Sequence, residues 1–163
     1  MAKARRRERE DRYDGDLCAG HLLVWTWRKF VSGHADCPLL AREYFSFAGE
    51  RADELLTAFA AFLQTLGHGS RRILAVGHPH CAGITPDEGQ ILRLIAAAQS
   101  DDTVLLTTHL RWLVKSEHQP ATQRAVNHLV ANLSACGVML PAVAIAPPPG
   151  AAMLEVVRRE CAK

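Results

Sequence analysis

Apolar residues recur at three- and four-residue intervals along most of the chain, which is the spacing of one face of an α-helix. The clearest stretch is residues 50–66, where this spacing joins Leu55, Leu56, Phe59, Phe62, Leu63 and Leu66. Gly67 follows at a position typical of a helix end, because glycine readily takes the left-handed conformation that closes a helix. The pattern therefore predicts a helix over residues 50–66.

The same spacing, together with start and stop signals, predicts further helices on both sides of this one. Thr85-Pro86-Asp87-Glu88 is a strong start signal, because it combines a capping threonine, a proline at the first helical position and a glutamate three residues after the cap. The other predicted helices cover residues 16–31, 38–49, 103–115, 122–136 and 151–162. We therefore expect a mainly α protein, a compact bundle of about five to seven helices.

The segment Arg71–Val76 departs from the helical pattern. It is short, apolar and partly β-branched, and such a run occurs both in strands and in merely extended chain. A strand needs a partner, and the run 138–146 is the candidate. We expect at most one short extended segment here, either paired with that run or unpaired.

Composition agrees with a helical fold. The chain has 163 residues, 48% of them hydrophobic and only 6% aromatic, and alanine is abundant. This balance favours closely packed helices over a β-sandwich or barrel, since strands prefer aromatic and β-branched residues. We expect a disordered charged arm over residues 1–15, one helical domain over 16–137, and a proline-rich segment with a short terminal helix over 138–163.

The net charge of +2 is concentrated at the N-terminus. Residues 1–12 hold six basic and three acidic side chains, whereas the remainder holds 13 and 14. A near-neutral body disfavours a broad nucleic-acid-binding face, so nucleic acid is an expected partner only through the Lys3–Arg12 arm.

No stretch has the pattern of a signal peptide or a transmembrane helix. The longest uncharged run, residues 138–153, is short and contains four prolines. The five cysteines are widely spaced and form no dense disulfide framework. These features predict a cytoplasmic protein with reduced thiols.

The richest candidate for chemistry is the loop Gly77-His78-Pro79-His80-Cys81. Two imidazoles and a thiol within four positions are donors that zinc and other transition metals prefer, and Pro79 stiffens the pair of histidines. A further donor must come from elsewhere. The candidates are two thiol–imidazole pairs, each three positions apart: Cys18 and His21, and His34 and Cys37. Eight histidines and five cysteines also produce such near pairs by chance, so both interpretations stay open.

Cys81 is also the one weak candidate for a catalytic residue. It lies next to His80 and shortly before the helix that begins near Thr85, and both neighbours favour a thiolate. A cysteine nucleophile also needs an orienting carboxylate or amide, which spacing does not identify, and no CxxC motif is present. The sequence therefore leans against an enzyme without deciding the question.

A third feature concerns association with other chains. Trp25, Trp27 and Phe30 lie on one predicted helix and Trp112 on another, and we expect a small domain to leave such a set partly uncovered. Packing in the core is the competing explanation. A protein partner or a homo-oligomer is therefore a realistic expectation.

No motif identifies a protein family, so three hypotheses follow from the residues alone. The first is a small cytoplasmic accessory or regulatory protein with a structural or sensory metal, zinc above all, at His78, His80 and Cys81. The alternative is a metal-free interaction module, or a subunit of a larger assembly, that uses the aromatic helix and the basic arm. An enzyme that depends on Cys81 comes third.

Overall fold

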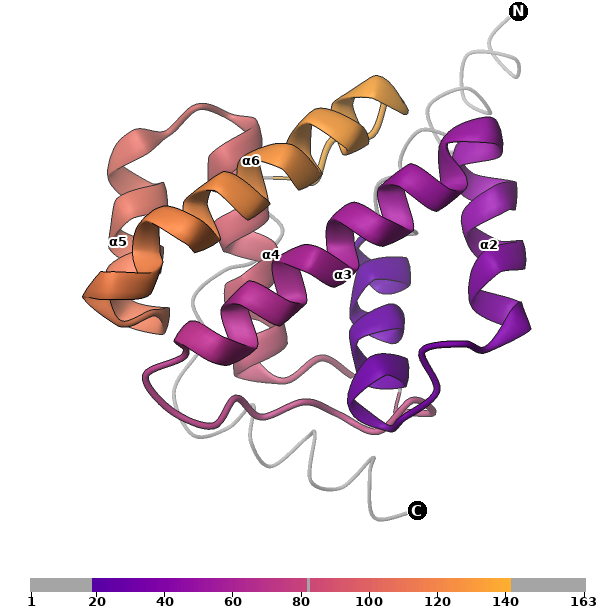
Figure 1. The fold of residues 1–163 in the computed structure, drawn as a ribbon, viewed down its shortest axis with the longest axis horizontal. Coiled ribbons are helices and arrows are strands. Elements are labelled where there is room, and N and C mark those ends of the chain that lie inside the picture. Colours follow the sequence, from indigo (N-terminus) through magenta and orange to yellow (C-terminus); the bar gives the residue numbers. More distant parts are fainter. Residues whose placement is uncertain (1–18, 82, 142–163) are drawn as a thin grey trace, which may run out of the picture.

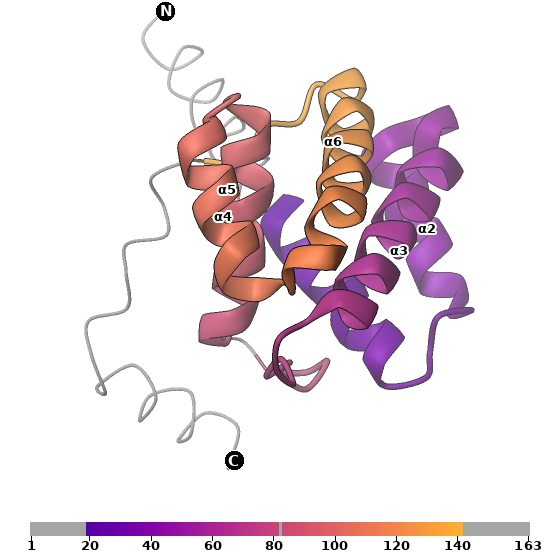
Figure 2. The same cartoon turned by 60° about the vertical axis from the view of Figure 1, so that its left-hand side comes forward.

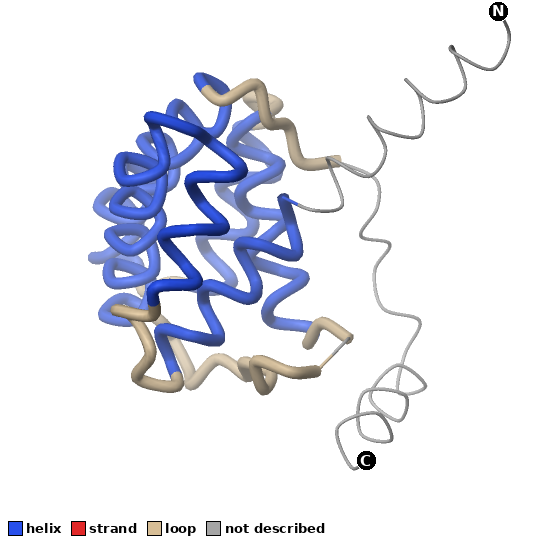
Figure 3. Tube along the Cα trace, turned by 90° about the vertical axis from the view of Figure 1, so that its right-hand side faces the viewer, coloured by secondary structure: helices blue, strands red, loops and turns tan. Residues whose placement is uncertain are grey.

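The described part of the chain, residues 19–81 and 83–141 of the computed structural model, is a bundle of helices (Figure 1). An N-terminal helix (residues 19–31) precedes α2 (Pro38–Ala48), α3 (Ala52–Gly69), α4 (Pro86–Gln99), α5 (Thr103–Leu113) and α6 (Gln119–Ala135). Short 3-10 turns, η1 (Gly49–Arg51) and η2 (Ser116–His118), lead into α3 and α6. No strand occurs within the described ranges (Figure 3), so the predicted mainly α bundle is confirmed.

The helices pair as neighbours along the chain, and α6 joins the pairs. Helix α2 packs on α3 and α4 packs on α5, while α6 contacts both α3 and α4. Figure 2 shows α6 between the two pairs. The N-terminal helix lies between α2 and α4 (Figure 1), so its side chains contact both of these helices.

The core follows the predicted helix faces. On α3, the positions Leu55, Phe59, Phe62 and Leu66 are at most 2% exposed, and they form one face at helical spacing. Burial of each such side chain stabilises the fold by about 1.5–3 kcal/mol relative to leaving it in water. Most of the stability of α3 therefore comes from this buried face.

Two local predictions need correction, and a third is confirmed. Helix α3 runs on to Gly69, because Gly67 does not take the left-handed conformation that would end it. Helix α6 begins at Gln119, because Pro120 falls in the first turn, where a missing N–H leaves no bond unmade. The predicted stop at Gly137 is confirmed, with a φ of 72°.

The segment Arg71–Val76 forms no strand, since residues 71 and 72 form a bend and residues 73–76 have no regular secondary structure. The structure has one antiparallel bridge beside it, between Ser70 and Val114. The predicted partner run 138–146 forms no strand as far as residue 141, and its remaining residues lie outside the described part. The prediction of at most one short extended segment is therefore confirmed, and no pairing of this segment with the run 138–146 occurs as far as residue 141.

Other predictions fall outside the described residues. The charged arm over residues 1–15 and the C-terminal helix over 151–162 belong to this group, so the domain boundaries stay predictions. Among the helices that the structure describes, none combines the length and apolar character needed to cross a membrane.

Tyr44 of α2 is a polar exception in the core. Its side chain is completely buried, and its hydroxyl makes no hydrogen bond of acceptable geometry with any described residue. The nearby Thr26 hydroxyl donates instead to the Leu22 carbonyl at 2.7 Å. Burial raises the pKa of Tyr44 far above its usual value.

Replacing Tyr44 by phenylalanine is therefore expected to stabilise the fold. A buried hydroxyl without a partner costs about 1–3 kcal/mol, and Tyr44→Phe removes it while keeping the ring. We expect the free energy of unfolding to rise by about 1 kcal/mol in urea denaturation. A loss of stability would show that the hydroxyl has a bonding partner and would contradict the prediction.

Candidate functional site

The loop His78-Pro79-His80-Cys81 is wrapped around the guanidinium of Arg28, which lies near the end of the N-terminal helix. Arg28 is buried, and its Nη1 donates to the carbonyl of His78 at 3.3 Å and to that of Cys81 at 2.6 Å. Its Nη2 donates to the carbonyl of Gly83 at 2.5 Å. A further bond, from the Cys81 N–H to the His78 carbonyl at 3.0 Å, closes the turn. Hydrogen bonds from the buried Arg28 side chain therefore hold the backbone of the loop in place.

Glu88, in the first turn of α4, forms an ion pair with Arg28, and we call Arg28, Glu88 and their bonds to the loop the clamp. Its two carboxylate oxygens accept from Nε and Nη2 of Arg28, each at 2.7 Å, in a bidentate ion pair that is fully buried. The same oxygens accept the backbone N–H groups of Gly77 at 2.9 Å and Thr85 at 2.7 Å. Both charges therefore have their hydrogen-bonding capacity filled, the condition under which a buried ion pair is tolerated.

Asp87 fixes the preceding segment in the same way. It accepts two hydrogen bonds from Arg72, at 2.5 and 2.8 Å, and one from the Ala75 N–H at 2.7 Å. These bonds from Arg72 hold the pKa of Asp87 below its usual value. Arg72 also lies over the ring of Trp112, 4.8 Å from its centroid. The first turn of α4 therefore organises the whole connection from α3 to α4.

The clamp brings two of the predicted metal donors together. The rings of His78 and His80 are both exposed, with centroids 5.3 Å apart and planes inclined by 40°. Cys81 differs from the prediction, because its sulfur is in a disulfide bond, whereas Cys37 and Cys136 are free. A disulfide sulfur is neither a thiolate ligand nor a nucleophile. The metal and enzyme roles of Cys81 thus stay predictions for its reduced form.

The additional donors do not join this pair in the described part of the chain. His34 is exposed and Cys37 half-buried in the turn after the N-terminal helix, whereas His21 lies on that helix and Cys18 outside the described residues. Within the described ranges, no three His, Cys, Asp or Glu side chains gather closely enough to hold a metal ion. A site with three or more protein ligands, and the choice of zinc, therefore stay predictions.

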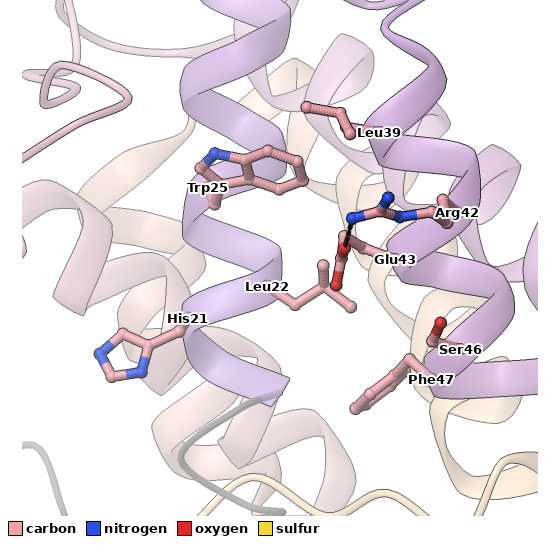
Figure 4. Close-up of a pocket in the computed structure, with 8 residues that line it drawn as sticks. All are labelled: His21, Leu22, Trp25, Leu39, Arg42, Glu43, Ser46 and Phe47. Carbon is pink, nitrogen blue, oxygen red and sulfur yellow. Dashed lines mark hydrogen bonds and ion pairs between the residues drawn. The ribbon is translucent and has the colours of Figure 1, made fainter.

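A second feature is a groove between the N-terminal helix and α2, with a volume of about 540 Å³. Its lining residues come from these two helices: His21, Leu22, Trp25, Leu39, Arg42, Glu43, Ser46 and Phe47. Figure 4 shows Leu22, Trp25 and Phe47 directed into the space between the helices, whereas His21 points away from α2. The groove therefore has an apolar floor and a polar edge.

The aromatic residues singled out in the sequence do not form one surface. Trp27 is buried in the core, and Phe30 packs against the core from a half-buried position. Trp25 lines the groove, whereas Trp112 lies on α5, half exposed beneath Arg72. Core packing thus accounts for Trp27, and of the four aromatic residues only Trp112 is largely exposed, since Trp25 and Phe30 are half-buried.

Two features of the site were missed by sequence reasoning. The one sequence signal for Arg28 was that it and Lys29 interrupt an otherwise apolar helix, and this signal does not separate the buried Arg28 from the half-buried Lys29. The groove had no sequence signal, because it depends on the distance between two helices. No protein-family model, curated protein sequence or solved structure matches this chain.

Proposed function

We propose that this protein is an interaction module that binds an amphipathic helix of a partner protein in the groove between the N-terminal helix and α2. The observation that carries the proposal is the apolar floor of this groove, to which Leu22, Trp25 and Phe47 contribute. Helix α2 has 11 residues and so spans about 16 Å, or three turns. That length suits a partner helix with apolar anchors at positions i, i+3 or i+4, and i+7.

The charges beside the groove indicate the chemistry of the partner helix. Lys29 lies over the Trp25 ring, 5.5 Å from its centroid, and Arg42 lines the opposite wall. Oε1 of Glu43 lies 3.3 Å from Nη2 of Arg42, so the carboxylate offsets the charge of Arg42. Because Arg42 pairs with Glu43, the unbalanced positive charge beside the groove comes from Lys29, which lies over Trp25. This charge favours a partner whose apolar stripe is flanked by acidic residues, since complementary charge steers association and sets orientation.

This proposal develops the interaction hypothesis rather than the metal-regulator or enzyme hypotheses. Binding in the groove requires only side chains that are in place in the described residues, whereas an enzyme or a metal site with Cys81 as third donor requires a Cys81 thiolate. The basic arm is not part of the proposal, because its residues lie outside the described part of the chain.

The test uses two designed helical peptides of about 14 residues, or roughly four turns. Both carry the same apolar stripe, flanked in one by glutamate and in the other by lysine. Fluorescence polarisation should show that the glutamate peptide binds at least tenfold more tightly, a difference of about 1.4 kcal/mol. Trp25→Ala should weaken this binding by about tenfold or more, since buried aromatic anchors dominate such interfaces.

Trp112→Ala is the matched control, because it removes a half-exposed tryptophan far along the chain from the groove. Its affinity for the glutamate peptide should equal that of the unmodified protein, with circular dichroism confirming that both variants fold. The proposal is wrong if neither peptide binds, or if both tryptophan variants weaken binding equally. A dimer in sedimentation that Trp25→Ala dissociates would identify a second copy as the occupant instead and would also overturn it.

A further inference from the structure

We propose that His78 and His80 form a two-imidazole binding site for a divalent transition metal ion such as zinc, without a contribution from Cys81. These two histidines lie in the loop before α4, and neither lines the groove. It replaces the expected set of three protein donors by the two that the described structure brings together.

The separation of the two rings fits shared coordination of one ion. Imidazole nitrogens bound to a tetrahedral zinc ion at about 2.0–2.1 Å place the two ring centroids roughly 5 Å apart. The observed separation of the His78 and His80 centroids is 5.3 Å. The rings therefore need little displacement of their centres to bind the same ion.

The backbone that carries both rings is already fixed. Arg28 holds the carbonyl of His78, at one end of the turn, and that of Cys81, immediately after His80. Pro79 restricts the backbone between the two histidines. A metal ion would thus not have to order the loop on binding, and avoiding that cost raises affinity. The buried clamp acts here as a positioning device for two exposed ligands.

The ring nitrogens are accessible to an ion from solvent. Both side chains are exposed, and the one hydrogen bond recorded for these rings within the described residues runs from the His80 N–H to Nδ1 of His78 at 3.4 Å. A bond of that length is weak, so giving it up costs little. Water would fill the remaining coordination positions, since only two protein ligands are provided.

The test is isothermal titration calorimetry of Zn²⁺ alone into tag-free protein. We expect one zinc ion per chain, and no binding of Mg²⁺ at the same concentration, because imidazole suits zinc whereas Mg²⁺ requires oxygen ligands. His78→Gln and His80→Gln should each weaken zinc binding by about 100-fold or more, because each removes a ligand. Loss of a residue that only supports a ligand already costs about 10–100-fold.

His128→Gln is the matched control, because it removes an exposed histidine from α6 and should leave zinc binding unchanged. The substituted positions are all exposed, so the fold should be retained, which circular dichroism checks. Absence of zinc binding by the unmodified protein overturns the proposal. Equal affinity of the unmodified protein and the double variant His78→Gln/His80→Gln overturns it as well, by placing the ion elsewhere.

Discussion

Replacing Glu88 by glutamine is expected to lower the free energy of unfolding by about 3–5 kcal/mol, because it leaves the buried guanidinium of Arg28 without its countercharge. The change is nearly isosteric, so cavity formation contributes little. It also replaces one acceptor oxygen by a donor NH₂ group, which would then face a donor of Arg28 and the backbone N–H of either Gly77 or Thr85. The loss therefore combines an unpaired buried charge with unsatisfied hydrogen-bonding groups.

The matched control is Glu54→Gln, because Glu54 forms an exposed ion pair with Arg51 at 3.8 Å. Exposed pairs contribute about 0–1 kcal/mol, so this variant should remain close to the unmodified protein. Urea denaturation followed by circular dichroism measures both. Similar small losses from the two substitutions would contradict the clamp, since they would show that water reaches Arg28 and Glu88.

Features set by residues close in sequence could be predicted. The capping box of α4 is present in full: the Thr85 hydroxyl accepts the Glu88 N–H at 3.1 Å, and Glu88 accepts the Thr85 N–H. The buried face of α3 follows from the spacing of its leucines and phenylalanines. Both depend on geometry within one or two helical turns, which the order of residues determines directly.

Only one of the two charged residues of the clamp, Glu88, could be recognised from the sequence. Glu88 was recognised for its role within α4, but its ion-pair partner Arg28 lies 60 residues earlier in the chain. Which arginine meets a given carboxylate depends on how the N-terminal helix packs against α4, and periodicity carries no information about that. For the same reason, the ion pair between Arg72 and Asp87 could not be predicted from the sequence.

The site also shows why residue type alone overstates chemistry. The histidines and the cysteine of the loop are close in sequence, yet the structure places the rings of His78 and His80 5.3 Å apart and the Cys81 sulfur in a disulfide bond. Spacing identifies which donors are near along the chain. The direction of each donor depends on the backbone turn, which is fixed here by the carbonyl contacts of Arg28.

The second large effect that we expect concerns two glycines at the end of α3. Replacing each by alanine should change the free energy of unfolding in opposite directions, although the two positions are only two residues apart. A Cβ at Gly69 would lie 2.6 Å from Cβ of His118 and 2.9 Å from Cγ1 of Val114. A Cβ at Gly67 would meet nothing within 4 Å. We expect Gly69→Ala to destabilise the fold by about 1–3 kcal/mol through overpacking, and Gly67→Ala to stabilise it by about 0.5–1 kcal/mol.

The clash at Gly69 is difficult to relieve because backbone bonds join the end of α3 to the segment after α5. The Lys115 N–H donates to the Gly69 carbonyl at 2.9 Å, and the Arg71 N–H donates to the Leu113 carbonyl at 3.0 Å. The nearest atom, Cβ of His118, cannot rotate away, since it is attached directly to the main chain. Gly67 faces solvent and lies in helical conformation, so alanine there reduces only the entropy of the unfolded chain. Thermal unfolding of both variants, followed by circular dichroism, should shift in opposite directions, and shifts of the same sign would contradict the close packing of α3 against this segment.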